Sequence, residues 1–236
     1  TINLAALDLY TTASAHTLAL VADKATTLNV TGNAGAALTL TSSVKLATLD
    51  ASASTGAVSA TSVSTAAITM KGGSAGDSFT ANGTTASTLI GNGGADTLTT
   101  NGGLTTLTGG DGLDLFVIAT AGANDGIYST ITDASAGDRI ELFDRGTEVF
   151  NTTKLALAGT ASFSDYLDAA SASTDATNST IRFFDFGGNT YIVEDNSTAT
   201  TFVDGADIVV GLTGIVDLST ASLSYDAGAD PVLMIV

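Results

Sequence analysis

Three glycine-rich turns that each end in aspartate carry the clearest chemical potential in this sequence. They read GGSAGD at 72–77, GNGGAD at 91–96 and GGDGLD at 109–114. The last turn opens the nonapeptide 109–117, which fits the pattern Gly-Gly-x-Gly-x-Asp-x-U-x, with U a large apolar residue, at every specified position. Carboxylate and carbonyl oxygens are the ligands that hard cations such as Ca²⁺ prefer. These turns therefore indicate cation chemistry.

The turns keep a register with the apolar residues that follow them. Phe79, Leu98 and Phe116 each occupy the eighth position of a nonapeptide, at spacings of 19 and 18 residues. Leu89 and Leu107 fall midway, in copies that lack the aspartate. A single glycine-rich turn with an aspartate would be a weak signal, but copies in register indicate an internal repeat.

The charge of the chain also favours cations as partners. The 236 residues include 24 acidic and 7 basic residues, for a formal net charge of −17, and all but three of the acids are Asp. Such a charge disfavours nucleic acids and anionic membranes, which need basic patches. The chain has no long apolar run, so we expect no membrane insertion. The absence of Cys excludes a disulfide scaffold, and the missing initial Met indicates a processed or truncated chain.

Three features could suggest an enzyme, and each has a plainer explanation. The run Gly72–Gly76 matches the G-x-S-x-G nucleophile elbow, but that motif needs a strand–turn–helix setting and a His partner. The chain has only His16, which nothing marks as a ligand, and it has no H-E-x-x-H motif. Asp133, Asp138 and Glu141 could form a carboxylate pair for glycoside chemistry, but turn roles are more common for such aspartates. We therefore expect no enzymatic activity.

The turns are connected by short strands, each of which is marked by one apolar residue. These marked residues are mostly 9 or 10 positions apart in the sequence. Very short strands with small joints cannot bury a face alone, but stacking buries a continuous narrow core. We predict a β-solenoid over about residues 17–117, within a domain of residues 1–117. A β-sandwich, which would show looser spacing, is the alternative. The marked residues are Leu20, Val30, Leu40, Leu49, Val58, Met70, Phe79, Leu89, Leu98, Leu107 and Phe116.

Residues 118–236 are richer in charged and aromatic residues and predict a mixed, β-rich unit. One helix is expected over 162–172, where apolar residues recur at helical spacing from Phe163 and Ser162 is a suitable N-cap. We expect this unit to cap the open end of the solenoid, because the last coil would otherwise expose strand edges. The predicted strands are 137–142, the hairpin 181–186 and 190–194 around the turn 187–189, 208–212 and 232–236.

The nonapeptide turns, the absence of Cys, the acidic charge and the apolar end 232–236 resemble the C-terminal region of a type I-secreted RTX protein. The degenerate Ala/Thr/Ser-rich repeats at 18–70 and the hairpin region 186–195 are most similar to bacterial surface-layer proteins of this family. The resemblance rests on motifs over roughly 72–117 and is looser elsewhere.

The resemblance implies a right-handed parallel β-roll, in which two nonapeptides complete one coil and alternate turns stack on one edge, about 4.8 Å apart. Asp77, Asp96 and Asp114 would then form a column that binds Ca²⁺ between consecutive pairs, with glycines chosen for positive φ. Ala75 departs from the pattern in the lower site, and Asp111 could add a partial site. On the other edge Thr105 replaces the aspartate, and no calcium is expected there. The implied ligands are Asp77, Asp96, Asp114, Asp111, Gly72, Gly91, Asn92, Gly94, Gly109, Gly110 and Gly112.

The resemblance also implies a function and a location. The expected function is that of a structural domain of an exported surface-layer protein on the bacterial cell surface, folded by external calcium and assembled with further copies into a two-dimensional lattice. Its C-terminus would carry an uncleaved signal for the type I secretion machinery. A non-catalytic RTX module of a secreted enzyme or adhesin is the alternative.

Overall fold

The computed structural model divides the chain into two compact units, Thr1–Val117 and Ile118–Val236. It describes residues 1–6, 16–19, 24–40, 45–62, 66–82, 86–101, 104–119, 126–142, 148–172, 179–225 and 230–236. Leu20 lies outside the described residues, as do 83–85 and 102–103 in the turns without aspartate.

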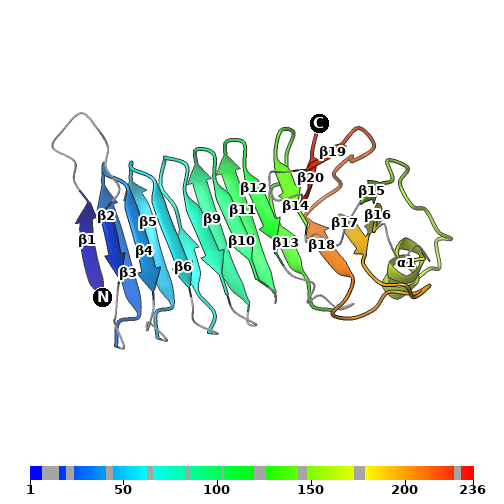
Figure 1. Ribbon diagram of the computed structural model, residues 1–236, viewed down its shortest axis with the longest axis horizontal. Coiled ribbons are helices and arrows are strands. Elements are labelled where there is room, and N and C mark those ends of the chain that lie inside the picture. The colour runs from blue at the N-terminus through cyan, green and yellow to red at the C-terminus, as the bar shows by residue number, and fades with distance from the viewer. Residues whose placement is uncertain are drawn as a thin grey trace. The chain divides into compact units, whose positions relative to one another are not determined.

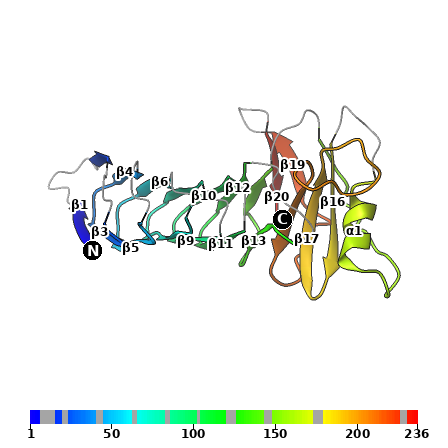
Figure 2. The ribbon, with the colours of Figure 1, turned by 90° about the horizontal axis from the view of Figure 1, so that it is seen from below.

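The N-terminal unit is a parallel β-solenoid, which confirms the fold predicted from the repeat (Figure 1). Successive strands alternate between two sheets, which Figure 2 shows as facing layers. The first sheet contains, in order, β1 (Ile2–Ala6), β3 (Thr27–Gly32), β5 (Thr48–Ser54), β7 (Thr69–Lys71), β9 (Ser87–Gly93) and β11 (Thr105–Asp111). The second contains β2 (His16–Ala19), β4 (Ala36–Leu40), β6 (Val58–Ser62), β8 (Ser78–Ala81), β10 (Thr97–Thr100) and β12 (Leu115–Ile118).

The solenoid starts earlier than the predicted residue 17. Strand β1 already pairs in parallel with β3, with Asn3 aligned to Asn29. These two residues are 26 positions apart, an interval longer than the repeat that predicted the other coils. The spacing rule therefore missed this first strand.

The core of the solenoid is a stack of apolar side chains in register along each sheet. The residues of the first sheet's column have no exposed surface, and burying a side chain of this size contributes roughly 1.5–3 kcal/mol. The column in the first sheet is Leu28, Leu49, Met70, Leu89 and Leu107. The column in the second sheet is Leu18, Leu38, Ala60, Phe79 and Leu98.

The register corrects three of the residues marked from the sequence. Val30, Leu40 and Val58 are buried, but each lies two residues from its column; Leu28, not Val30, aligns with Leu49. The reason is that strands such as β3 bury two apolar residues on one face. The spacing alone could not decide which of the two keeps the register.

The C-terminal unit is β-rich with a single described helix, as predicted. One group of strands has the order β13-β18-β17-β16-β15 and a second has the order β19-β20-β14. The predicted hairpin is present: β16 and β17 are antiparallel, and Gly187 and Gly188 form the turn with φ of 58° and 85°. The strands are β13 (Ser129–Ile131), β14 (Arg139–Glu141), β15 (Val149–Phe150), β16 (Thr180–Phe186), β17 (Asn189–Asp195), β18 (Ile208–Leu212), β19 (Ser222–Tyr225) and β20 (Pro231–Met234).

Helix α1 (Phe163–Ala170) begins where its capping residue predicts. Ser162 and Asp165 form a capping box, each side chain accepting a hydrogen bond from the other's backbone amide. At the other end, Arg182 Nη1 donates to the carbonyl oxygen of Ala170 at 2.7 Å. The helix ends at Ala170, two residues before the predicted end, and it buries Leu167 and Ala170 in the unit's core.

Candidate metal site

The structure brings the three turn aspartates together in one column. Ser78 aligns with Thr97 in the strands that follow the turns, so Asp77 and Asp96 precede paired residues. Asp114 occupies the same place before β12. The three residues are buried, with 3%, 1% and 1% of their surface exposed.

Backbone amides of one coil hold the carboxylate of the next. Asp77 Oδ1 accepts a hydrogen bond from the Val58 amide at 2.6 Å. Asp96 Oδ1 accepts one from the Asp77 amide at 2.6 Å, and Asp114 Oδ1 accepts one from the Asp96 amide at 2.9 Å. These bonds fix the position and orientation of every carboxylate in the column.

The carboxylates explain why each turn begins with glycine. A Cβ atom on Gly72, Gly91 or Gly109 would lie 2.1, 2.0 or 2.1 Å from Oδ2 of the aspartate in the same turn. At these three positions the reason is therefore lack of space, whereas positive φ was the reason expected for the glycines of the turns in general. Positive φ is found at Gly94 (107°), Gly110 (100°) and Gly112 (151°).

Asp96 has a buried carboxylate oxygen, Oδ2, with no hydrogen-bond donor. The corresponding Oδ2 of Asp77 accepts a bond from the Gly73 amide at 2.7 Å. The carbonyl oxygen of Gly109 in the next coil faces the same space as Asp96 Oδ2. The point where a Cβ on Gly91 would sit is 2.0 Å from that carboxylate oxygen and 2.5 Å from that carbonyl oxygen. Two acceptor oxygens thus meet between coils, an arrangement that a cation stabilises.

The electrostatics of the column disfavour bare carboxylates. Burial raises the pKa of Asp96 from 3.8 to about 7; the Asp77 amide opposes the shift, and the negative charges of Asp114 and Asp77 add to it. Burial also raises the pKa of Asp77, against the amides of Val58 and Gly73. Without a counter-charge, the ionised carboxylate of Asp96 is destabilised by lost hydration and by its charged neighbours, and that of Asp77 by lost hydration.

On the opposite edge of the solenoid, neutral hydroxyl groups occupy the aspartate position. Ser87 and Thr105 stand two residues before the buried leucines of β9 and β11 and are themselves buried. Ser87 Oγ accepts a hydrogen bond from the Ile68 amide at 3.2 Å, and Thr100 Oγ1 donates to Thr105 Oγ1 at 3.0 Å. Thr105 was predicted at this position and Ser87 was not, although aligning the nonapeptides on their eighth position places both residues there.

The other predicted ligands take different places. Asn92 has φ of 75° and donates through Nδ2 to the Gly72 carbonyl oxygen at 2.6 Å. Asp111 is exposed, unlike the buried column, and its backbone oxygen accepts a hydrogen bond from the Gly94 amide at 2.9 Å. In the described ranges no three side chains of His, Asp or Glu group together as a metal site. A cation at the column would therefore complete its ligands with backbone carbonyl oxygens, as Ca²⁺ commonly does.

Two of the features that could suggest an enzyme, the run Gly72–Gly76 and Asp138, lie in turns. The run Gly72–Gly76 lies in the first aspartate turn and leads into strand β8, whereas a nucleophile elbow leads into a helix. Asp138 accepts hydrogen bonds from the amide and the hydroxyl of Ser135, at 2.8 and 3.0 Å. This is the turn role expected from the sequence.

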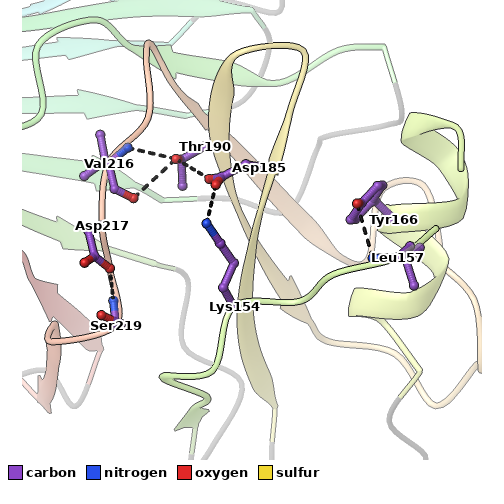
Figure 3. A network of polar contacts seen from close by, with 8 residues as sticks. All are labelled: Lys154, Leu157, Tyr166, Asp185, Thr190, Val216, Asp217 and Ser219. Atoms are coloured by element: carbon purple, nitrogen blue, oxygen red, sulfur yellow. Dashed lines mark hydrogen bonds and ion pairs between the residues drawn. The ribbon is translucent and has the colours of Figure 1, made fainter. Parts of the chain in front are cut away.

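A network of polar contacts around Lys154 links three segments of the C-terminal unit (Figure 3). Lys154 Nζ lies 2.6 Å from Asp185 Oδ2, and this hydrogen bond, with the charges of Asp185 and Asp217, raises the pKa of Lys154. Thr190 Oγ1 donates to Asp185 Oδ1 at 2.8 Å and accepts from the Val216 amide at 2.9 Å. The network fixes the segments around 154 and 216 to the β16–β17 hairpin.

No known protein-family model matches this chain, and no curated protein is significantly similar to it in sequence. In the part of the chain that the structure describes, no helix has the length and apolar character needed to cross a bilayer. The aspartate column is therefore the feature of the molecule that points to a function.

Proposed function

We propose that this chain is a structural calcium-binding module of an exported bacterial surface protein, folded and stiffened by Ca²⁺ bound along the column Asp77, Asp96 and Asp114. The observation that carries the calcium part is Asp96 Oδ2, buried without a donor and facing the Gly109 carbonyl oxygen. A buried charged oxygen without a partner is costly, and a bound cation removes that cost.

The two edges of the solenoid support a role for the charge itself. Ser87 accepts the amide of the preceding coil with a neutral hydroxyl group, so holding that amide does not require a carboxylate. The edge that contains the aspartate column nevertheless has a buried Asp in three successive coils. The hydrogen bonds to backbone amides therefore do not explain why these positions have negatively charged side chains. A bound cation explains the charge.

The chemistry of the column fits calcium better than magnesium. Ca²⁺ accepts six to eight oxygen ligands at about 2.3–2.6 Å in flexible geometry, whereas Mg²⁺ needs a near-octahedral shell at about 2.0–2.1 Å and keeps several waters. The column is buried and offers carboxylate and backbone carbonyl oxygens. Such a site favours an ion that gives up its water readily.

Calcium binding would be coupled to folding, because the ligands converge only in the stacked coils. A ligand that binds only the folded state stabilises it by about 2.7 kcal/mol at a free concentration of 100 times Kd. With no calcium, the bare carboxylates oppose stacking of the last coils.

The resemblance to RTX surface-layer proteins extends the proposal to export and assembly. A chain that is unstable without calcium suits a type I secretion machinery that passes unfolded chains, and external calcium would then fold it at the cell surface. There the chains would assemble with further copies into a two-dimensional layer. The formal net charge of −17 agrees with a protein whose assembly needs cations.

Thermal unfolding followed by circular dichroism tests the calcium proposal. We expect the protein to melt at a higher temperature in 5 mM Ca²⁺ than in EGTA, and Mg²⁺ at the same concentration to restore only a small part of the difference. A melt that EGTA leaves unchanged contradicts calcium binding.

Electron microscopy tests the assembly proposal separately. We expect sheets or two-dimensional crystals in millimolar Ca²⁺ and none in EGTA. A strict monomer that is nonetheless stabilised by Ca²⁺ would favour the alternative, a non-catalytic module of a secreted enzyme or adhesin.

A further inference from the structure

The aspartate column contains two contacts between successive turns, and they differ. The lower interface lies between turns 72–77 and 91–96, and the upper interface lies between turns 91–96 and 109–114. A regular repeat would place equivalent atoms in both. The structure shows equivalent aspartates but different surroundings.

The lower interface is satisfied by donors of the protein itself. Asn92 Nδ2 donates to the Gly72 carbonyl oxygen at 2.6 Å. The Gly73 amide donates to Asp77 Oδ2 at 2.7 Å, and the Val58 amide donates to Asp77 Oδ1 at 2.6 Å. Both carboxylate oxygens and a turn carbonyl therefore have a partner without a metal ion.

The upper interface has no such side-chain donor. Gly110 aligns with Asn92 in the parallel register, so no side chain stands where Asn92 stands in the coil before. Asp96 Oδ2 has no hydrogen-bond donor and shares its space with the Gly109 carbonyl oxygen. At the lower interface the Gly91 carbonyl oxygen lies beside Asp77 Oδ2 in the same way, 2.4 and 2.1 Å from the point where a Cβ on Gly72 would sit. The two interfaces therefore differ in their donors: Asp77 Oδ2 has the Gly73 amide, whereas Asp96 Oδ2 is left for an external cation.

The backbone conformation of the turns also differs between the two interfaces. In turn 91–96 the second and fourth residues, Asn92 and Gly94, have positive φ of 75° and 107°. In turn 109–114 the matching residues, Gly110 and Gly112, have φ of 100° and 151°. In turn 72–77 neither Gly73 nor Ala75 has positive φ. Only the upper interface is thus flanked by two turns that both have positive φ at their second and fourth residues.

We infer that the column binds a single Ca²⁺ at the upper interface, and that the side-chain amide of Asn92 takes the place of a second ion at the lower interface. This inference rests on the proposed function, because it specifies where the proposed calcium binds. Asp96 and the Gly109 carbonyl group are the ligands it names, and Asn92 sets the number of ions.

Isothermal titration of the metal-free full chain with CaCl₂ tests the inference. We expect one ion per chain for the wild type. Asn92→Asp, which the left-handed backbone tolerates, replaces the donor with a carboxylate beside the Gly72 carbonyl group, and we expect two ions per chain. Asn101→Asp is the matched control, because Asn101 Nδ2 donates to Asn82 Oδ1 on the opposite edge; we expect one ion.

Two further variants locate the ion and do not depend on Asn92→Asp folding. We expect Asp96→Asn to lower calcium affinity at least 100-fold, and Asp77→Asn to change it by less than threefold. Two ions in the wild type, or one ion in a folded Asn92→Asp variant, overturns the inference while calcium binding stands. No heat of binding and no calcium-induced stabilisation in the wild type removes the proposed function and this inference together.

Discussion

At the scale of single residues, Asp96 has opposite effects on the stability of the folded state through its two carboxylate oxygens. Its Oδ1 accepts the Asp77 amide and its own amide donates to Asp114 Oδ1, so it joins three coils. Its Oδ2 has no donor. The residue therefore stabilises the stack through one oxygen and destabilises it through the other unless a cation is bound.

We expect Asp96→Asn to stabilise the protein in the absence of calcium and to destabilise it in the presence of calcium. In EGTA the variant should be more stable than the wild type by about 1–3 kcal/mol, because an amide removes the buried charge and can donate to the Gly109 carbonyl oxygen. In saturating Ca²⁺ it should be less stable than the wild type, because the ion is lost. Urea denaturation with and without Ca²⁺ measures both differences.

Asp77→Asn is the matched comparison, with a different expected result. Both oxygens of Asp77 accept backbone amides, so the NH₂ group of Asn would face a donor. We expect a loss of about 1–3 kcal/mol with or without Ca²⁺. Equal and negligible effects of both substitutions would contradict the column as an energetic unit.

The pH dependence of the metal-free protein follows from the pKa of Asp96, which burial raises from 3.8 to about 7. The folded state then holds the proton more tightly than the unfolded state. The stability that protonated Asp96 contributes to the folded state is therefore fully present below about pH 4, and it is lost as the pH rises to about 7. In EGTA we expect a lower melting temperature at pH 8 than at pH 5, and a shallower dependence in Asp96→Asn.

Calcium should reverse this trend, because the ion competes with the proton for the same carboxylate. The rise in melting temperature caused by Ca²⁺ should be larger at pH 8 than at pH 5. A calcium effect that is equal at both pH values would place the ion away from Asp96.

Gly91→Ala tests the close approach of the Asp96 carboxylate. The new Cβ would lie 2.0 Å from Asp96 Oδ2 and 2.5 Å from the Gly109 carbonyl oxygen. The backbone oxygen cannot move without shifting a coil, so we expect a loss of about 1–3 kcal/mol. Gly159→Ala, where nothing lies within 4 Å of the new atom, should change the stability by about 0.5 kcal/mol or less. Similar losses for both would show that space is not the constraint.

The residues of the site could be predicted only in part. The column Asp77, Asp96 and Asp114 could be predicted from the coil geometry that the resemblance to RTX repeats implies, because residues one coil apart then stack. The donors Val58 and Gly73 could not be predicted, since an amide carries no sequence signal. The asymmetry between Asn92 and Gly110 depends on which turns are left-handed, which is a property of the folded backbone.

At the scale of elements, the solenoid changes its chemistry along its length. Ala36, Val58, Asp77 and Asp96 occupy the same position in successive coils of the second sheet, each just before or at the start of its paired segment. Ala36 and Val58 are buried apolar residues. The aspartate column is thus a continuation of the apolar core, and the early coils are held by packing where the later ones have carboxylates.

Helix α1 shows what local sequence decides and what it does not. Its start could be predicted, because the Ser162 cap is a local interaction. Its end could not, because Arg182, which donates to the Ala170 carbonyl oxygen, comes from strand β16.

Ser162→Ala should destabilise the protein by about 1 kcal/mol, because the Asp165 amide loses its acceptor. Ser164→Ala is the control, since Ser164 is exposed within the helix and Ala is the better helix former there; it should be neutral or slightly stabilising. Urea denaturation of both variants gives the two values. An unchanged Ser162→Ala variant would show that the capping box adds nothing to global stability.

At the scale of the whole molecule, calcium bound at the column would make the late coils of the solenoid depend on the metal for stability and leave the early coils independent of it. Each coil contacts only its neighbours, so its stability depends mainly on its own packing and on the adjacent interface. The early coils have amide–carbonyl contacts between turns, such as Thr55 to Gly32 at 2.8 Å, and an apolar core. The late coils add the acidic column, so only they should depend strongly on the metal.

Hydrogen exchange followed by mass spectrometry tests this division. When EGTA replaces Ca²⁺, amides in 87–118 should lose protection by about 100-fold, which corresponds to about 2.7 kcal/mol of binding energy. Peptides over 27–40 should change far less, because their interfaces contain no carboxylate column. The β16–β17 hairpin in the other unit is the internal reference. If protection fell equally across the whole N-terminal unit, the coils would unfold together, and the metal would stabilise the entire solenoid rather than its last turns.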